Sequence, residues 1–144
     1  MTVEPVRTRL RVAVTGTVSD AHTWNLIYLQ LFLEELGHHV DNLGCCTPAE
    51  EVADHCREHR PDLVVFSTVN GHGYSDGLLA IRLLREVAPT VPAVIGGKLG
   101  ITGGADRHLR EALLGAGFTA VFEDNASPLA LKDFVRELEL CGAS

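Results

Sequence analysis

Short apolar segments alternate with amphipathic segments along the whole chain, and this alternation limits the folds open to it. β-Branched and apolar runs favour strands, whereas apolar residues spaced three or four apart favour helices. Strands are predicted at residues 8–16, 38–44, 62–67, 92–97 and 119–124, and helices at residues 24–37, 47–59, 77–87, 106–117 and 127–142. Strands and helices in strict alternation form a parallel sheet that helices cover on both faces.

The predicted fold is a flavodoxin-like (Rossmann-like), doubly wound α/β domain with a five-stranded parallel sheet of order 2-1-3-4-5. The chain has 144 residues, 46% of them hydrophobic, which suffices for one domain with a buried core. We assign residues 1–8 to an N-terminal tail and residues 9–141 to a single domain. In this strand order the switch point lies between the first and third strands, where ligands bind at the carboxyl ends.

Several predicted helices have recognisable terminal residues. Gly37 is predicted to cap the C-terminus of the first helix. Thr47 is the predicted N-cap of the second helix, with Pro48 at its first position and Glu50 completing a capping box. The inner face of the third helix is predicted to consist of Leu79, Leu83 and either Leu84 or Val87.

The charge balance and the lengths of the apolar runs exclude some classes of partner. The formal net charge is −7, the pI is near 5.4, and no cluster of lysine and arginine forms a basic stripe. These features argue against nucleic acid and anionic membrane as partners. No apolar run approaches the roughly 20 residues of a bilayer span. Residues 1–10 lack the apolar core of a signal peptide, so we expect a cytoplasmic protein.

The cysteines give no sign of a disulfide framework or a zinc site. The chain has four, and none forms a CxxC pair: Cys45, Cys46, Cys56 and Cys141. Adjacent cysteines do not readily form a standard disulfide or a zinc knuckle. We therefore expect reduced thiols that are mostly buried.

Three loops of unusual composition follow the first, third and fourth strands. They are TVSDAHTWN (17–25), STVNGHG (67–73) and GGKLGITGG (96–104). Because these strands are neighbours in the predicted sheet, their loops would meet around one crevice. The last loop has five glycines in nine residues, and glycine permits close approach of the backbone to a bulky ligand. A phosphate-binding glycine motif is missing after the first strand, where it would be expected.

Asp20 and His22 in the first loop allow two interpretations. One is a metal-ligating histidine whose other ring nitrogen donates to a carboxylate, which fixes the tautomer. The other is a turn or helix cap at Asp20, with His22 at the surface. A zinc ion usually needs four ligands, and no nearby cysteine or histidine completes such a set. A single protein ligand therefore makes sense only for a metal that arrives inside a macrocycle.

Ser67, Gly71 and Gly73 after the third strand also allow two interpretations. The glycines can serve ordinary turn geometry, because glycine adopts positive φ without strain. Alternatively, Ser67 is a strand-end hydroxyl that hydrogen-bonds a buried ligand nitrogen. His72, which lies between the two glycines, is predicted to face a partner or solvent rather than to be a second ligand.

Taken in order, short motifs in these loops resemble those of a known family. The motifs Asp20-x-His22, Ser67-x-Val69 and Gly96-Gly97 resemble the DxHxxG…SxL…GG pattern of cobalamin-binding domains, which are flavodoxin-like. The resemblance extends over nearly the whole chain and is strongest toward the small subunits of glutamate mutases (methylaspartate mutases). The chain departs from the pattern at Asn25, which stands in place of glycine, at Trp24 before it, and at Val69, which replaces leucine.

The resemblance implies a role for each matching residue. His22 would be the lower axial ligand of cobalt, with Asp20 as its hydrogen-bond partner. Ser67 would hydrogen-bond the displaced dimethylbenzimidazole of the cofactor. No residue of this chain would be catalytic. The implied cofactor-binding residues are Ser19, Asp20, Ala21, His22, Thr23, Ser67, Thr68, Val69, Gly71, Gly96, Gly97, Lys98, Leu99, Gly100, Ile101, Thr102 and Phe122.

The resemblance further implies the small subunit of an isomerase, an adenosylcobalamin-dependent carbon-skeleton mutase. It would interconvert glutamate and 3-methylaspartate by a radical mechanism, with a catalytic large subunit covering the upper face of the corrin. Three alternatives stay open: a corrinoid carrier for methyl transfer, a non-catalytic cobalamin-binding module, and a plain flavodoxin-like or receiver-type domain. The last fits poorly, because Ser67 and Thr68 end the third strand where a receiver needs its acceptor aspartate.

Overall fold

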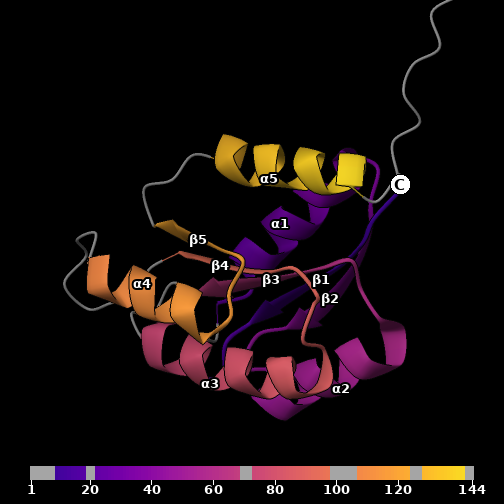
Figure 1. Ribbon diagram of the computed structural model, residues 1–144. Helices are drawn as coiled ribbons and strands as arrows, with labels where there is room; N and C mark the ends of the chain where they lie inside the picture. Colours follow the sequence, from indigo (N-terminus) through magenta and orange to yellow (C-terminus); the bar gives the residue numbers. More distant parts are fainter. Residues whose placement is uncertain (1–8, 19–21, 69–72, 98–106, 124–127, 142–144) are drawn as a thin grey trace, which may run out of the picture.

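Residues 9–18, 22–68, 73–97, 107–123 and 128–141 are described by a computed structural model, in which a parallel sheet lies between two layers of helices (Figure 1). The strands are β1 (Arg11–Gly16), β2 (His39–Gly44), β3 (Leu63–Thr68), β4 (Ala93–Gly97) and β5 (Ala120–Glu123). Their order is β2-β1-β3-β4-β5, and every neighbouring pair is parallel. The predicted fold class and strand order are confirmed.

The helices divide between the two faces of the sheet (Figure 1). One face is covered by α1 (Trp24–Glu35) and α5 (Pro128–Cys141), and the other by α2 (Ala49–His59), α3 (Gly73–Val87) and α4 (Arg107–Ala116). Within the described residues, none of the helices has the length and apolar character needed to cross a membrane.

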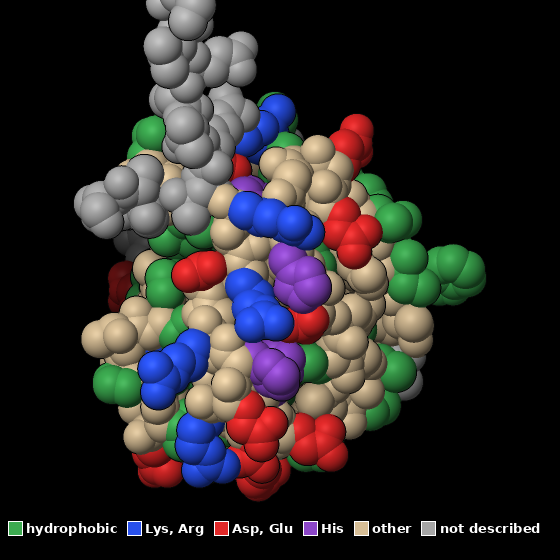
Figure 2. All heavy atoms as spheres, turned by 90° about the vertical axis from the view of Figure 1, so that its right-hand side faces the viewer, with side chains coloured by type: hydrophobic (Ala, Val, Ile, Leu, Met, Phe, Trp, Pro, Cys, Tyr) green, Lys and Arg blue, Asp and Glu red, His purple; other side chains and the backbone are tan. Residues whose placement is uncertain are grey.

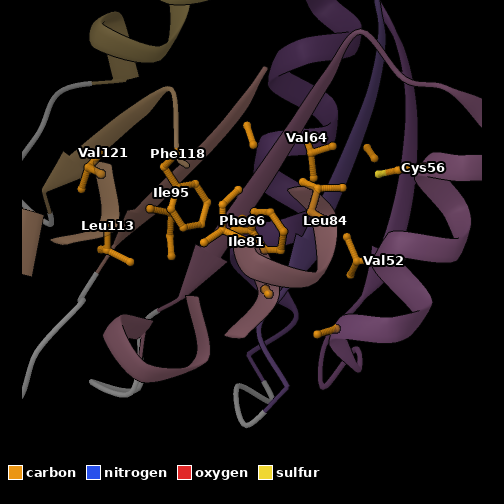
Figure 3. Packing of buried hydrophobic residues seen from close by; sticks show 14 residues of the cluster. Val52, Cys56, Val64, Phe66, Ile81, Leu84, Ile95, Leu113, Phe118 and Val121 are labelled. Atoms are coloured by element: carbon orange, nitrogen blue, oxygen red, sulfur yellow. The ribbon is translucent and has the colours of Figure 1, made fainter. Parts of the chain in front are cut away.

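The sheet is buried on both faces, and each face has its own hydrophobic cluster. On the side of α2, α3 and α4, Phe66 packs edge-on against Phe118 with ring centroids 5.6 Å apart, next to Ile81 (Figure 3). On the side of α1 and α5, the strand valines pack against fully buried Leu33 and Val135. Each such side chain contributes roughly 1.5–3 kcal/mol when fully buried, so both helical layers are held to the sheet.

The C-terminus of α1 confirms the prediction made for Gly37. This glycine has φ +99°, and its N–H donates to the Glu34 carbonyl at 2.9 Å. The next amide, that of His38, donates to the Leu33 carbonyl at 3.2 Å. These two bonds form a Schellman motif, which satisfies carbonyls that the helix leaves without a partner.

The predicted start of the second helix is wrong at its cap. The N-cap of α2 is Pro48, and no side chain caps the helix. The Thr47 hydroxyl instead donates to the Gly44 carbonyl at 2.7 Å, within the turn that follows β2. A threonine hydroxyl can hydrogen-bond the backbone of a turn as readily as that of a helix N-terminus, and Thr47 bonds the turn.

The third helix differs from the prediction in its start and in its inner face. It begins at Gly73 rather than near Gly77, and Leu79 is 51% exposed. Gly77 is buried where α3 packs on β4, and a Cβ there would lie 2.7 Å from Cδ1 of Ile95. A small residue thus lets α3 approach β4 closely, and this rotates Leu79 outward.

The described cysteines are less buried than expected. Cys56 is buried, Cys45 is half-buried and Cys46 is exposed. Burial raises the pKa of the Cys56 thiol to about 11, so this residue behaves as a small apolar side chain.

Charged side chains gather at the amino edge of the sheet, where the strands begin (Figure 2). Asp41 accepts a hydrogen bond from Nε2 of His39 at 3.1 Å. Its other carboxylate oxygen lies 3.7 Å from Nε of Arg11 and 3.5 Å from Nε2 of His55. Asp62 accepts the backbone N–H of Arg11 at 2.8 Å. The amino edge is therefore a network of mutually paired charges.

A buried contact, which we call the His38–Glu139 clasp, joins α5 to the amino edge. Both side chains are 2% exposed, and Nε2 of His38 lies 2.6 Å from Oε1 of Glu139. The backbone N–H of Leu10 donates to Nδ1 of His38 at 3.0 Å, so the ring proton is on Nε2 and is donated to the carboxylate. Nη1 of Arg136 donates to both carboxylate oxygens at 3.1 Å. Both oxygens of this buried carboxylate thus accept hydrogen bonds from protein groups.

Candidate functional site

The candidate site lies at the carboxyl edge of the sheet, where β1, β3, β4 and β5 end side by side. The register pairs Gly16 with Ser67, Ser67 with Gly96, and Gly96 with Phe122. We call these four residues the edge row. Three of its members, Ser67, Gly96 and Phe122, are residues that the sequence singled out, and the sheet brings them into one line.

The edge row belongs to the sheet face that α1 and α5 cover. Side chains alternate between the two faces along a strand, and Val14, Val65 and Val94 precede the row by two residues in the cluster under α1 and α5. The row replaces these valines by glycine, serine and glycine. At its end, Phe122 packs edge-on against Phe134 of α5, with ring centroids 6.2 Å apart. Side-chain bulk is therefore removed from this face where the strands end.

Gly96 and Gly97 are glycines for different reasons. Gly97 has φ +105°, and a Cβ there would lie 1.9 Å from the carbonyl oxygen of Thr68, so the backbone itself requires glycine. A Cβ on Gly96 would only reach ordinary contact with Phe122, at 3.4 Å. The protein alone does not demand glycine at position 96. Its missing methyl group leaves room beside Ser67, as a bulky flat ligand group would need.

His22 and Thr23 lie at the start of α1, next to the carboxyl end of β1. The His22 side chain is exposed. Thr23 is the N-cap residue, and its carbonyl accepts the amides of Leu26 and Ile27. Its hydroxyl does not cap the helix but lies 3.6 Å from Sγ of Cys45, in the turn after β2. An imidazole held at a helix start and open to solvent can coordinate a metal brought by a ligand.

The two departures from the resembled pattern are accommodated at the surface. The Trp24 side chain is 82% exposed, and that of Asn25 is also exposed. Both residues belong to the first turn of α1. Their side chains therefore point away from the core, so the larger residues do not obstruct the edge row from within the domain.

The sequence-predicted site residues divide into two groups. At the carboxyl edge the structure brings together His22, Thr23, Ser67, Thr68, Gly96, Gly97 and Phe122. Among them, Thr68 is 1% exposed, and strand alternation directs it to the face opposite Ser67. The others lie outside the described residues: Ser19, Asp20, Ala21, Val69, Gly71, Lys98, Leu99, Gly100, Ile101 and Thr102.

Sequence reasoning missed Gly16 and Thr17. Gly16 completes the edge row, which only the pairing of Gly16 with Ser67 reveals. Thr17 is 2% exposed, and its Oγ1 has no hydrogen-bond partner in the described part of the chain. It lines a small cavity with Thr47 and Asp76 on the opposite face of the sheet. The available signal was their position at the end of the first strand, directly after the buried run of residues 12–15.

Other features of the described residues do not compete with this site. A cavity of about 640 Å³ lies at the amino edge, and its lining includes Arg57, Asp62 and Pro92 but none of the predicted site residues. In the same described ranges, no three His, Cys, Asp or Glu side chains are grouped to hold a metal ion.

Comparisons with known proteins connect the sequence to one family. The sequence pattern of the B12 binding domain matches residues 10–136. The chain is 28% identical over 120 residues to glutamate mutase sigma subunit 2 of Haloarcula marismortui, a match that covers 83% of this chain and 81% of that protein. It is 30% identical over 124 residues to the glutamate mutase sigma subunit of Halobacterium salinarum, covering 85% and 83%, respectively.

Solved structures share the fold at lower identity. A cobalamin-binding protein from Desulfitobacterium hafniense has a TM-score of 0.61 and 17% identity, with 94% of this chain and 58% of that chain covered. The receiver domain of the Francisella response regulator 1452 has a TM-score of 0.72 and 17% identity, covering 93% and 99%. Because domains of different function share this fold, and the receiver domain has the higher TM-score, these likenesses establish the fold alone.

Proposed function

Because the chain belongs to the family of B12-binding domains, we propose that it is the cobalamin-binding subunit of a glutamate mutase. The sequence pattern of the B12 binding domain matches residues 10–136 of the chain, and the two relatives described above are sigma subunits of glutamate mutases. In this proposal the cofactor is adenosylcobalamin and the protein acts in the cytoplasm. The reaction is the interconversion of glutamate and 3-methylaspartate.

The observation that carries the proposal is the edge row. Cobalamin is a flat macrocycle with a nucleotide tail, and a tail with its base displaced needs a narrow, apolar slot at the sheet. Gly16, Ser67 and Gly96 leave that face without bulky side chains, and Phe122 bounds it. The Ser67 hydroxyl would supply one hydrogen bond for a nitrogen of the base, and residues 96–102 would line the tail.

His22 would hold the cofactor from below as the lower axial ligand of cobalt. Asp20 would accept the proton of the second ring nitrogen, which fixes the tautomer and strengthens the imidazole as a donor. When bound, adenosylcobalamin supplies a cobalt–carbon bond that can break homolytically to start radical chemistry. The residues of this chain position the macrocycle and keep its tail out of water.

A catalytic partner subunit is part of the proposal. The residues assigned here bind a cofactor, and none of them is assigned to a substrate. The relatives are themselves named as subunits. A partner that covers the upper face of the corrin would provide the substrate pocket and exclude water from it.

A spectroscopic titration tests the role of His22. The purified protein is titrated with cobalamin, and the visible spectrum reports whether the cofactor's own base is displaced by a protein histidine. We expect a base-off, histidine-ligated spectrum for the wild type and for His59→Ala, an exposed histidine in the last turn of α2. For His22→Ala we expect the histidine-ligated spectrum to be lost. If His22→Ala gives the wild-type spectrum, His22 is not the ligand.

The tail slot and the reaction are tested separately. Cobinamide, which lacks the nucleotide tail, should bind at least tenfold more weakly than cobalamin, because it forfeits the contacts of the edge row. Equal affinities would contradict the slot. Adding the catalytic subunit of a glutamate mutase with adenosylcobalamin should then restore turnover of glutamate, whereas methylcobalamin should not. Cofactor binding without turnover would favour a non-catalytic cobalamin-binding module or a corrinoid carrier.

A further inference from the structure

The outer face of α1 carries an unusual row of exposed apolar side chains. Trp24, Ile27, Tyr28 and Leu31 are 82%, 37%, 55% and 59% exposed, respectively. Their spacing of three, four and seven residues places them on one side of the helix. We call these four residues the α1 stripe.

The opposite side of α1 is already used by the core. Leu26 and Leu33 are 1% and 0% exposed, and Leu29 and Phe32 pack against the same cluster. The helix is therefore apolar both toward the sheet and toward solvent, and its first charged residue is Glu34. A surface helix normally has one apolar face toward the core and a polar face toward solvent, so a second apolar face indicates a further contact.

The flank of the stripe is polar, as the rim of an interface is. Nε2 of Gln30 donates to Glu34 at 3.0 Å, and Nδ2 of Asn42 on β2 donates to Gln30 at 3.2 Å. An apolar centre with a hydrogen-bonded margin is the arrangement that protein interfaces use.

The stripe is too small to support a stable contact by itself. A large side chain offers about 150–250 Å² when fully exposed, so the four residues present roughly 450 Å² together. A stable interface takes about 800 Å² from each partner. A second copy of this chain seated on the stripe alone would fall short, and two chains of net charge −7 would also repel each other. The occupant must gain further area elsewhere.

The stripe continues directly from the candidate cofactor site. Trp24 is only two residues after His22, and Leu31 lies seven residues further along α1, roughly 10 Å down the helix axis. A partner that covers a cofactor bound at His22 would also contact Trp24. It would then bury the carboxyl edge and the stripe as one surface, which supplies the missing area.

From these observations we infer that the α1 stripe is a docking surface for the catalytic subunit, outside the region that touches the cofactor. The inference rests on the proposed function, since that function supplies the partner. Tyr28 and Leu31 are its most informative members, because they are well exposed and lie beyond the first turn, away from His22. Trp24 would join the stripe to the rim of the cofactor site.

The test compares two leucine-to-lysine variants of the cobalamin-loaded protein. Leu31→Lys places a charge in the stripe, whereas Leu140→Lys places one on α5 at a leucine of similar exposure, 68%. Binding to the catalytic subunit of a glutamate mutase is measured by sedimentation or interferometry. We expect Leu31→Lys to weaken it roughly 10- to 100-fold, because a charge in an interface core is left without a partner. Leu140→Lys should change it less than about threefold.

Two controls make the outcomes distinct. Both variants and Tyr28→Lys are titrated with cobalamin alone, and thermal melting checks their folding. Unchanged cobalamin affinity with weakened assembly in Leu31→Lys and Tyr28→Lys supports the docking surface. Three results would each overturn it: assembly of Leu31→Lys and Tyr28→Lys at wild-type affinity, no assembly by the wild type, or a dimer of this chain that Leu31→Lys dissociates. Failure of the wild type to bind cobalamin would instead overturn the proposed function.

Discussion

The two edges of the same sheet are built by opposite means. At the amino edge, Asp41, Asp62 and Glu139 each accept hydrogen bonds from neighbouring protein groups, and Glu139 does so where it is 2% exposed. At the carboxyl edge, the edge row presents two glycines and a serine beside Phe122, and Thr17 keeps a buried hydroxyl without a partner among the described residues.

This contrast separates stability from binding within one small domain. At the amino edge the carboxylates of Asp41, Asp62 and Glu139 accept hydrogen bonds from protein groups, and these contacts tie helices to strands. Among the described residues there, Nε2 of His55 lies 3.5 Å from Asp41 and makes no hydrogen bond. Among the described residues of the carboxyl edge, Gly96 leaves space beside Ser67, and the Thr17 hydroxyl has no hydrogen-bond partner. Substitutions at the amino edge should therefore change folding without changing cofactor affinity, and substitutions in the edge row should do the reverse. Gly97 is the exception, because it belongs to the carboxyl edge but is fixed by its backbone.

The largest effect is expected for Gly97→Ala. The added Cβ would overlap the carbonyl of Thr68 at 1.9 Å in a backbone of φ +105°, so β3 and β4 must separate. We expect a loss of about 4 kcal/mol in the free energy of unfolding, measured by urea denaturation. Gly115→Ala is the matched control, since nothing lies within 4 Å of its Cβ position, and it should be neutral or stabilising. Equal stability of the two variants would contradict this account.

A somewhat smaller effect is expected for Glu139→Ala. Removing the carboxylate leaves the buried N–H of His38 and the guanidinium of Arg136 without their acceptor. We expect a loss of about 3 kcal/mol in the free energy of unfolding, with cobalamin affinity unchanged. Glu137→Ala, an exposed position two residues earlier, should cost less than about 0.5 kcal/mol. A large loss of cofactor affinity in Glu139→Ala would break the separation between the two edges.

Gly96→Ala sharpens the comparison from the other side. Its Cβ would be tolerated at 3.4 Å from Phe122, so the free energy of unfolding should change by less than about 0.5 kcal/mol. The same methyl group would fill the space beside Ser67, and cobalamin affinity should fall about tenfold, which is about 1.4 kcal/mol. Spectroscopic titration measures this change. Unchanged affinity would mean that the tail does not lie along the edge row.

The smallest effect is a pH dependence of the amino edge. Burial and the neighbouring His59 lower the pKa of His55 below 6.5, and Arg11 adds to this, while Asp41 and Glu58 oppose it. The folded protein thus binds fewer protons at this site than the unfolded chain, so stability is fully present above pH 6.5 and falls as the pH drops through 6.5. Denaturation at about pH 7.5 and about pH 5.5 should show a smaller acid loss in His55→Gln. Identical losses would show that His55 does not contribute.

The fold could be predicted because its signals are local. Strand runs and helical spacing can be recognised without knowledge of distant residues. A glycine directly after the helical pattern likewise sufficed to predict the C-terminal cap at Gly37. One error arose where two local hydrogen bonds compete, and the other where a tertiary contact decides. The Thr47 hydroxyl donates to a carbonyl in the preceding turn instead of capping the helix. Leu79 faces outward because Gly77 is the residue that packs close to Ile95.

The candidate site was predictable as a list of loops but not as a surface. Ser67 and Gly96 could be placed at strand ends from the sequence, yet their pairing, and the inclusion of Gly16, depend on the register of three strands. The different reasons for Gly96 and Gly97 depend on a φ angle and on a carbonyl from a neighbouring strand. Neither quantity is written in the local sequence.

The His38–Glu139 clasp also has a consequence for the order in which the chain acquires its structure. Its two residues are 101 positions apart, so the contact cannot form until α5 has been synthesised. Such long loops close late, because their closure entropy must be overcome before the contact is gained. The same helix covers the sheet face that carries the edge row. A nascent or truncated chain without α5 would therefore leave the part of this face under α5 uncovered, including Phe122, which packs against Phe134.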